Sequence, residues 1–238
     1  MRFSKGGSSS PPAPVRTPDT LRSQDTVEFV VGISEGEIEG LVDGAKSYFI
    51  GQTQLENEDD TPNLQNFTLE DFHGPAVPQD VITMQLGGGS RSTTVDVDLF
   101  QNVPVVRETL SGTIDFIVFR LAVNELYYQD DSGIYTSSLT FTLEYKPHSG
   151  STWTTVTGAP ITISGKTTSL YVKTIRVPVA QLPDDHYDLR VTKLTAEADG
   201  TNNFQDMTFE SFQEIVAGNL SFPNLACTHV VGQSSDQF

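Results

Sequence analysis

The chain has 238 residues, 37% of them hydrophobic, with 14 basic against 31 acidic side chains and a formal net charge of −17. This length and hydrophobic content are enough for a globular protein with one domain of ordinary size or two small ones. The excess of carboxylates argues against a protein that grips nucleic-acid phosphates, since that work needs clustered Lys and Arg. The negative charge is equally consistent with an ordinary soluble surface and with the wall of a conduit along which DNA slides.

The N-terminal residues, MRFSKGGSSSPPAP, lack the apolar segment of a signal peptide, and no apolar run is long enough for a membrane span. We therefore expect the protein to stay in the compartment where it is made. Residues 1–25 are rich in Gly, Ser and Pro and predict a flexible N-terminal arm. This arm is either a disordered tail or an extended segment that orders against a neighbouring subunit.

A glycine-rich stretch follows, from Val27 to Tyr48. Its opening VEFVV favours a β-strand, and glycines then recur every fourth residue, too often for a stable helix. Tight turns with positive φ are predicted instead, before a second strand near residues 45–51. The glycines concerned are Gly32, Gly36, Gly40 and Gly44.

The pentapeptide GISEG within this stretch fits the G-x-S-x-G pattern of serine hydrolases, with Ser34 as the nucleophile. That motif needs a strand, a sharp turn and a helix in succession, and Gly36 and Gly40 disfavour the helix. No complete set of nucleophile, base and orienting residue stands elsewhere in the sequence. We predict no enzymatic activity and no cofactor.

Metal sites are not predicted either. The single cysteine, Cys227, excludes a disulfide framework and a cysteine-based zinc site. Residues 52–78 read as a long connection whose acidic cluster, residues 56–60, lacks the order of a calcium loop. The histidines stand in unrelated contexts without a metal-binding spacing: His73, His148, His186 and His229.

From residue 81 the sequence consists of short runs typical of β-strands, separated by turn residues such as Gly87–Ser90. The runs are 81–86, 93–99, 103–110, 113–123, 139–145, 153–156, 161–164, 169–177 and 187–194. Strands at this spacing indicate a β-sandwich. Tyr187 begins a segment like the tyrosine-corner strand of immunoglobulin-like domains, and Trp153 is expected to fill the core.

An alternative to a structural role is a carbohydrate-binding or adhesive β-sandwich module. Such a module needs exposed aromatic side chains on one face, and the candidates are Tyr127, Tyr128, Tyr135 and Tyr145. A nucleotide site is disfavoured: SGKTT at 164–168 contains the G-K-T of a P-loop, but Pro160 occupies the position of its first glycine and a strand follows. Near the C-terminus, the spacing of Phe209, Phe212 and Ile215 favours a short helix over 208–216.

Two of these segments resemble the host-specificity protein J family of lambda-like long-tailed phages. The first reads I-S-E-G-x-I-E-G-x-V-D-G-x-K-S and contains Ser34, Glu35, Gly36, Glu39, Gly40, Asp43, Gly44 and Lys46. The second reads I-x-G-K-T-T-S-x-Y and contains Gly165, Lys166, Thr167, Thr168 and Tyr171. Phe222–Asn224 and Asp236–Phe238 also follow the family, which implies an extended segment over 208–216 and leaves helix or strand open there.

The resemblance implies a mainly β protein with a hub-type domain, residues 26–107 together with 205–238. An immunoglobulin- or fibronectin-like sandwich of residues 110–200 is inserted into it. It also implies a structural protein of the virion tail tip, made in the host cytoplasm: the N-terminal part of a central hub. The hub is expected to be a homotrimer that contacts other tail-tip proteins in tail assembly, host attachment and DNA delivery, without sequence-specific nucleic-acid binding.

Two further expectations come from the resemblance. The family protein continues beyond the point that corresponds to Phe238, so we expect this chain to be an N-terminal fragment or one part of a divided hub. Glu35, Glu39 and Asp43 are expected to cap turns or to pair across subunits.

Overall fold

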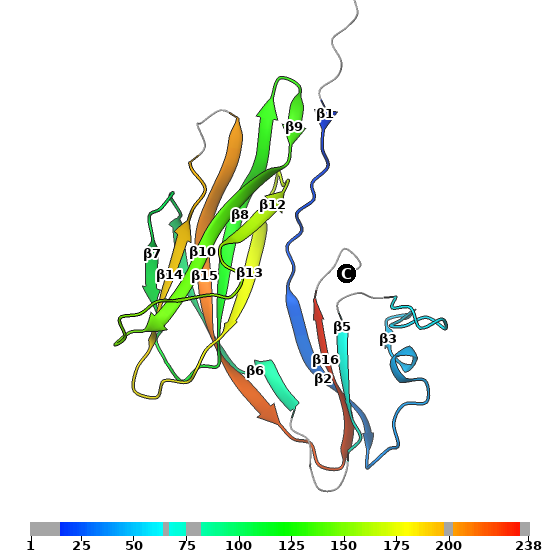
Figure 1. Ribbon diagram of the computed structural model, residues 1–238. Helices are drawn as coiled ribbons and strands as arrows, with labels where there is room; N and C mark the ends of the chain where they lie inside the picture. The colour runs from blue at the N-terminus through cyan, green and yellow to red at the C-terminus, as the bar shows by residue number, and fades with distance from the viewer. Residues whose placement is uncertain (1–14, 64–66, 75–81, 198–201, 234–238) are drawn as a thin grey trace, which may run out of the picture.

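The computed structural model describes residues 15–63, 67–74, 82–197 and 202–233. Strands make up nearly all of the regular structure (Figure 1), as the sequence predicts. Within these ranges the only helix is the 3-10 turn η1 (Gly44–Ser47), and no helix there has the length and hydropathy of a membrane span. The predicted match at Asp236–Phe238 lies outside the described residues.

Two sheets form the predicted β-sandwich (Figure 1). The first has the order β1 (Val15–Arg16), β9 (Gly133–Tyr135), β8 (Phe116–Asp130), β15 (Asn203–Leu220) and β6 (Ile82–Asp98), and β13 (Tyr171–Pro178) also pairs with β8. The second has the order β11 (Thr154–Thr155), β10 (Ser137–Pro147), β14 (Tyr187–Lys193) and β7 (Val105–Glu108), and β12 (Ile161–Gly165) also pairs with β10.

Alternation of apolar and polar residues explains the core between these sheets. Along β10, Leu139, Phe141 and Leu143 are completely buried while the residues between them are not, and Phe119 and Leu121 of β8 belong to the same cluster. Each such side chain contributes roughly 1.5–3 kcal/mol when it leaves water. The core therefore fixes which face of each strand points inward.

The tyrosine corner predicted at Tyr187 is present. Its side chain is buried, and its hydroxyl donates a hydrogen bond to the carbonyl oxygen of Ala180. A second buried polar group, the Glu214 carboxylate, accepts the N–H groups of Leu110 and Ser111 at 3.0–3.2 Å. These bonds hold the connection after β7 against β15, and they give the buried carboxylate the hydrogen-bond partners that it needs.

A smaller sheet has the order β2 (Thr26–Glu35), β16 (Leu225–Gln233) and β5 (Phe67–Phe72), and β3 (Phe49–Ile50) pairs with β4 (Thr53–Gln54). The long strands β6 and β15 pair with each other from the sandwich to this sheet (Figure 1). Their far ends pack with Cys227 in a second cluster, through Ile82 and Met84. The division into residues 26–107 with 205–238 and residues 110–200 stays a prediction.

The segment 208–216 is a strand, so the helix favoured by its spacing is wrong and the extended segment implied by the resemblance is confirmed. The register of β15 shifts between Phe209 and Ser211 against both neighbouring strands. A bulge of this kind adds one residue and reverses the alternation of faces. Phe209 and Phe212 consequently both reach the core, with ring centroids 6.3 Å apart, and their three-residue spacing imitates a helix.

The predicted turn at Gly87–Ser90 is also wrong, because β6 continues through it. Met84 lies opposite Gly218, and Gly89 lies opposite Val216. Between these two pairs β6 contains more residues than β15, and the strands accommodate the difference as a register shift. Residues 52–78, read as a connection, contain the strands β4 and β5. The second strand expected over 45–51 is limited to β3, since η1 precedes it.

Trp153 does not fill the core. Its side chain is half-buried, and its ring packs against the charged groups of Arg190, 4.2 Å from the ring centroid, and Lys146, 5.4 Å away. Arg190 is in turn held by Glu144 at 2.7 Å. Tyr187 and the apolar residues of β10 and β14 form the core at this end instead.

Candidate assembly surface

The first family motif forms the end of β2 and the turns that follow it. Gly36, Gly40 and Gly44 have φ values of 90°, 131° and 52°, which side chains other than glycine rarely adopt. The turn predicted at Gly32 is wrong, because Gly32 lies inside β2 opposite Cys227. The strand therefore continues to Glu35. The N–H of the next residue, Gly36, donates to the carbonyl oxygen of Asn224 at 2.7 Å.

The charged and hydroxyl residues of this motif have separate partners. Ser34 lies in β2 opposite Ala226 and its hydroxyl donates to the carbonyl oxygen of Glu35, so no nucleophile elbow is formed. Lys46 forms an ion pair with Asp60 at 2.6 Å, and the hydrogen bond to Asp60 raises the pKa of this lysine. The acidic cluster of residues 56–60 thus supplies a partner for the motif.

The acidic side chains of the motif make no ion pair with any described residue: Glu35, Glu39 and Asp43. Asp43 stands at the N-cap of η1, but its carboxylate accepts no capping hydrogen bond. Asp43 thus does not cap η1, which leaves the other half of the expectation, pairing across subunits. Pairing across subunits stays a prediction for all three residues.

The second family motif, Gly165–Tyr171, binds the N-terminal arm of the same chain. The Lys166 ammonium, 1% exposed, forms an ion pair with Asp19. The other carboxylate oxygen of Asp19 accepts hydrogen bonds from Thr168, from N–H at 3.1 Å and from the hydroxyl at 2.8 Å. Because these bonds favour the ionised carboxylate, first that from Lys166 and then that from Thr168, the pKa of Asp19 falls to about 2.

The backbone of the motif also fits the arm closely. Lys166 N–H donates to the Thr20 hydroxyl at 2.9 Å, and Thr20 N–H donates to the Lys166 carbonyl oxygen at 2.9 Å. A Cβ atom on Gly165, whose φ is 154°, would lie 2.8 Å from the Thr20 hydroxyl oxygen. Residues 15–25 are therefore ordered on the sandwich of their own chain, in contrast to the predicted flexible arm; residues 1–14 lie outside the described part.

The remaining motif residues hold the loop itself in place. Thr167 exchanges two backbone hydrogen bonds of 2.9 Å with Leu126, and its hydroxyl donates to the Ser169 carbonyl oxygen at 2.6 Å. Tyr171 starts β13 and is buried, which raises the pKa of its phenol. The motif thus serves as a docking site for the arm, a role that its sequence alone did not predict.

An apolar stripe lies exposed on β2, which among the described strands pairs only with β16 and so forms an edge of its sheet. Its members are Val27, Phe29, Val31 and Ile33, each between 37% and 47% exposed. Beside it, a groove of about 560 Å³ is lined by Phe49, Ile50 and Phe67. Exposed apolar patches and unpaired strand edges of this kind typically mark interaction surfaces.

The tyrosines considered for carbohydrate binding do not form an exposed platform. Tyr127 is buried and stacks on Phe204, with ring centroids 4.3 Å apart. The ring centroids of Tyr128 and Tyr135 lie 6.4 Å apart, and Tyr145 packs edge-on against Tyr187. These contacts place the aromatic rings in packing roles.

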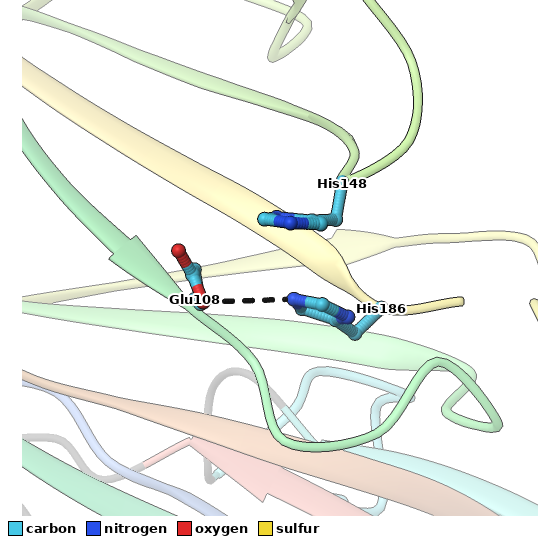
Figure 2. A group of neighbouring side chains, drawn as sticks. All are labelled: Glu108, His148 and His186. Atoms are coloured by element: carbon cyan, nitrogen blue, oxygen red, sulfur yellow. Dashed lines mark ion pairs between the residues drawn. The ribbon is translucent and has the colours of Figure 1, made fainter.

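The structure gathers three residues that the sequence analysis treated as unrelated: Glu108, His148 and His186 (Figure 2). The two imidazole rings stack with centroids 4.2 Å apart, and His186 Nε2 lies 3.6 Å from a carboxylate oxygen of Glu108. The hydrogen bond to Asp188 raises the pKa of His148. Only the strand register brings these residues together, so no local sequence signal could have found them.

Comparisons with known proteins identify the same family as the two motifs. A sequence model of the family "Tip attachment protein J, FNIII-A domain" matches residues 90–218. The tip attachment protein J of Escherichia phage SECphi4 is 24% identical over 229 residues, 95% of this chain and 20% of that protein. The chain therefore spans about a fifth of the length of this curated relative.

Two solved structures show a weaker likeness. The GH115 4-O-methyl-α-glucuronidase BtGH115A is 11% identical with a TM-score of 0.29, covering 69% of this chain and 20% of the enzyme. The stem and receptor-binding domain of spike protein P1 from bacteriophage PM2 is 10% identical with a TM-score of 0.29, covering 92% of this chain and 100% of that one. At this TM-score neither likeness indicates a function.

Proposed function

The chain belongs to the tip attachment protein J family, and on this premise we propose that it is the N-terminal part of a homotrimeric hub in a phage tail tip. Its role is structural: it assembles with copies of itself and with other tail-tip proteins, and so supports host attachment and DNA delivery. We assign it no catalytic step.

The apolar stripe of β2 carries this proposal. A strand edge with four adjacent apolar side chains exposed costs solubility unless another surface covers it. Because its four apolar side chains are gathered along one strand, the stripe is the part of the described molecule that we expect to be buried between subunits. The neighbouring groove at Phe49 and Phe67 extends the same surface.

The proposed domain division supports the same role. Residues 26–107 and 205–238 contribute β2, β5 and β16, the sheet that presents the stripe. Residues 110–200 contribute most of the sandwich, which lies beside that sheet (Figure 1). Subunits that meet through β2 would leave the sandwich free to contact other tail-tip proteins.

The mass of the chain in solution tests the proposal. By light scattering after gel filtration we expect three times the chain mass of 26.0 kDa for the wild type, and the monomer mass for Val31→Glu. Val103→Glu is the matched control, because Val103 is 52% exposed but lies outside the stripe. A wild-type monomer, or a Val31→Glu variant that stays trimeric, would contradict the proposal.

A further inference from the structure

The strand register brings three side chains to one end of the second sandwich sheet. Asp188 in β14 lies opposite Glu108 in β7, and Tyr187 lies opposite Pro147 in β10. Just beyond, His148 N–H donates to the His186 carbonyl oxygen at 2.8 Å. Glu108, His148 and His186 therefore project from three adjacent strand ends toward the same face (Figure 2).

Their polar atoms lie at distances close to those of a metal site. One imidazole nitrogen from each histidine and one carboxylate oxygen of Glu108 all lie within 4.8 Å of one another. A tetrahedral ion with bonds of about 2.1 Å keeps its ligand atoms roughly 3.4 Å apart. The side chains of Glu108, His148 and His186 are 60%, 46% and 30% exposed, so solvent leaves them room to close this difference by rotating out of the stack.

Neighbouring carboxylates lie beside both rings. His148 Nδ1 donates to Asp188 at 2.8 Å, which leaves Nε2 as the free acceptor. On His186, Nε2 lies 3.6 Å from Glu108 and Nδ1 lies 3.8 Å from Asp185, a distance too long for a hydrogen bond. Lys146 forms an ion pair with Asp188 at 2.6 Å. Metal-binding histidines in proteins usually have such a carboxylate on the nitrogen that does not bind the metal.

We propose that Glu108, His148 and His186 bind a divalent transition-metal ion, with Zn²⁺ as the ion that their chemistry suits best. Two imidazoles and one carboxylate are ligands that zinc accepts, and three protein ligands leave a fourth position for water or for a side chain of a neighbouring protein. The bound ion joins the ends of β7, β10 and β14. It adds to the ion pairs of Asp188 with Lys146 and His148, which already join β10 to β14 at this end of the sandwich.

Titration of the metal-free chain with ZnCl₂ by calorimetry tests this site. We expect one ion per chain with a micromolar Kd, and a loss on the order of 100-fold in affinity for the double variant His148→Gln/His186→Gln, as expected when ligands are removed. His73→Gln is the control, since His73 is outside the cluster and should bind Zn²⁺ as the wild type does. Asp188→Asn should weaken binding about 10-fold through the orientation of His148.

A second measurement distinguishes ligation from a general effect on folding. CoCl₂ in place of ZnCl₂ should give visible absorption bands of a tetrahedral cobalt site with the wild type and with His73→Gln, but not with the double variant. Circular dichroism should show that the double variant is folded. Binding weaker than millimolar, or equal binding by the wild type and the double variant, would overturn the proposal.

Discussion

Replacing Asp19 by asparagine should release the N-terminal arm from the sandwich. The change removes the partner of Lys166, whose side chain is 1% exposed beneath the arm. Breaking a buried ion pair at one side costs about 3–5 kcal/mol, because a charge is left buried without compensation. Here the arm can lift and admit water to Lys166, so we expect a loss near the lower limit, about 3 kcal/mol.

The pH dependence of stability also indicates how much the Asp19 carboxylate contributes to the folded state. The pKa of Asp19 is lowered from its ordinary value of 3.8 to about 2 in the folded protein, so the unfolded chain binds this proton more tightly. The carboxylate therefore stabilises the fold above pH 3.8, and this contribution is lost as the pH falls from 3.8 toward 2. Lowering the pKa from 3.8 to about 2 corresponds to about 2 kcal/mol before solvent screening of this carboxylate, which is 27% exposed, is taken into account.

Urea unfolding monitored by circular dichroism measures the loss, and trypsin cleavage after Arg16 and Arg22 reports whether the arm is docked. Asp19→Asn should be cleaved at these sites faster than the wild type, and it should show a weaker fall in stability between pH 4 and pH 2. Adding Lys166→Met should restore part of the stability, because it removes the unpaired charge. Asp184→Asn, in an exposed loop, is the control. Wild-type stability and wild-type protection of the arm in Asp19→Asn would refute the reasoning.

Three further substitutions test other parts of the structure. Gly165→Ala should raise tryptic cleavage of the arm, because its Cβ would lie 2.8 Å from an arm hydroxyl, whereas Gly32→Ala, whose Cβ would meet the Leu225 side chain at an ordinary 3.7 Å, should not. Glu214→Gln should lower the free energy of unfolding in urea by about 2 kcal/mol, since two backbone N–H groups lose a charged acceptor; an unchanged unfolding midpoint would contradict this. Trp153→Ala should cost only about 1 kcal/mol in the same assay, as expected for a surface cation–π contact, and a loss of 3–5 kcal/mol would indicate a core residue instead.

Local patterns predicted the parts of the fold that local chemistry decides. The run 139–145, predicted as a strand of a sandwich, forms β10, and the positive φ predicted at Gly36 and Gly40 follows from their lack of a side chain. The helix favoured around Phe212 failed because a bulge, which depends on two neighbouring strands, changed the spacing of buried residues.

The contacts within the candidate sites depend on register between distant segments. Asp19 and Lys166 are 147 residues apart in the chain, and neither position shows its partner in the sequence. Glu108 and Asp188 become neighbours only because β7 and β14 pair antiparallel at that position. Family motifs identified Lys166 as a residue of interest, but its function in holding the arm required the three-dimensional structure.

The pairing of β6 with β15 also determines how the molecule bears load. These strands have 17 and 18 residues, so each is roughly 60 Å long, and they join the sandwich to the sheet that contains β2. Hydrogen bonds in an antiparallel ladder run perpendicular to the strands. A pull between the two ends of the molecule therefore loads these bonds together in shear, whereas peeling would break them one at a time.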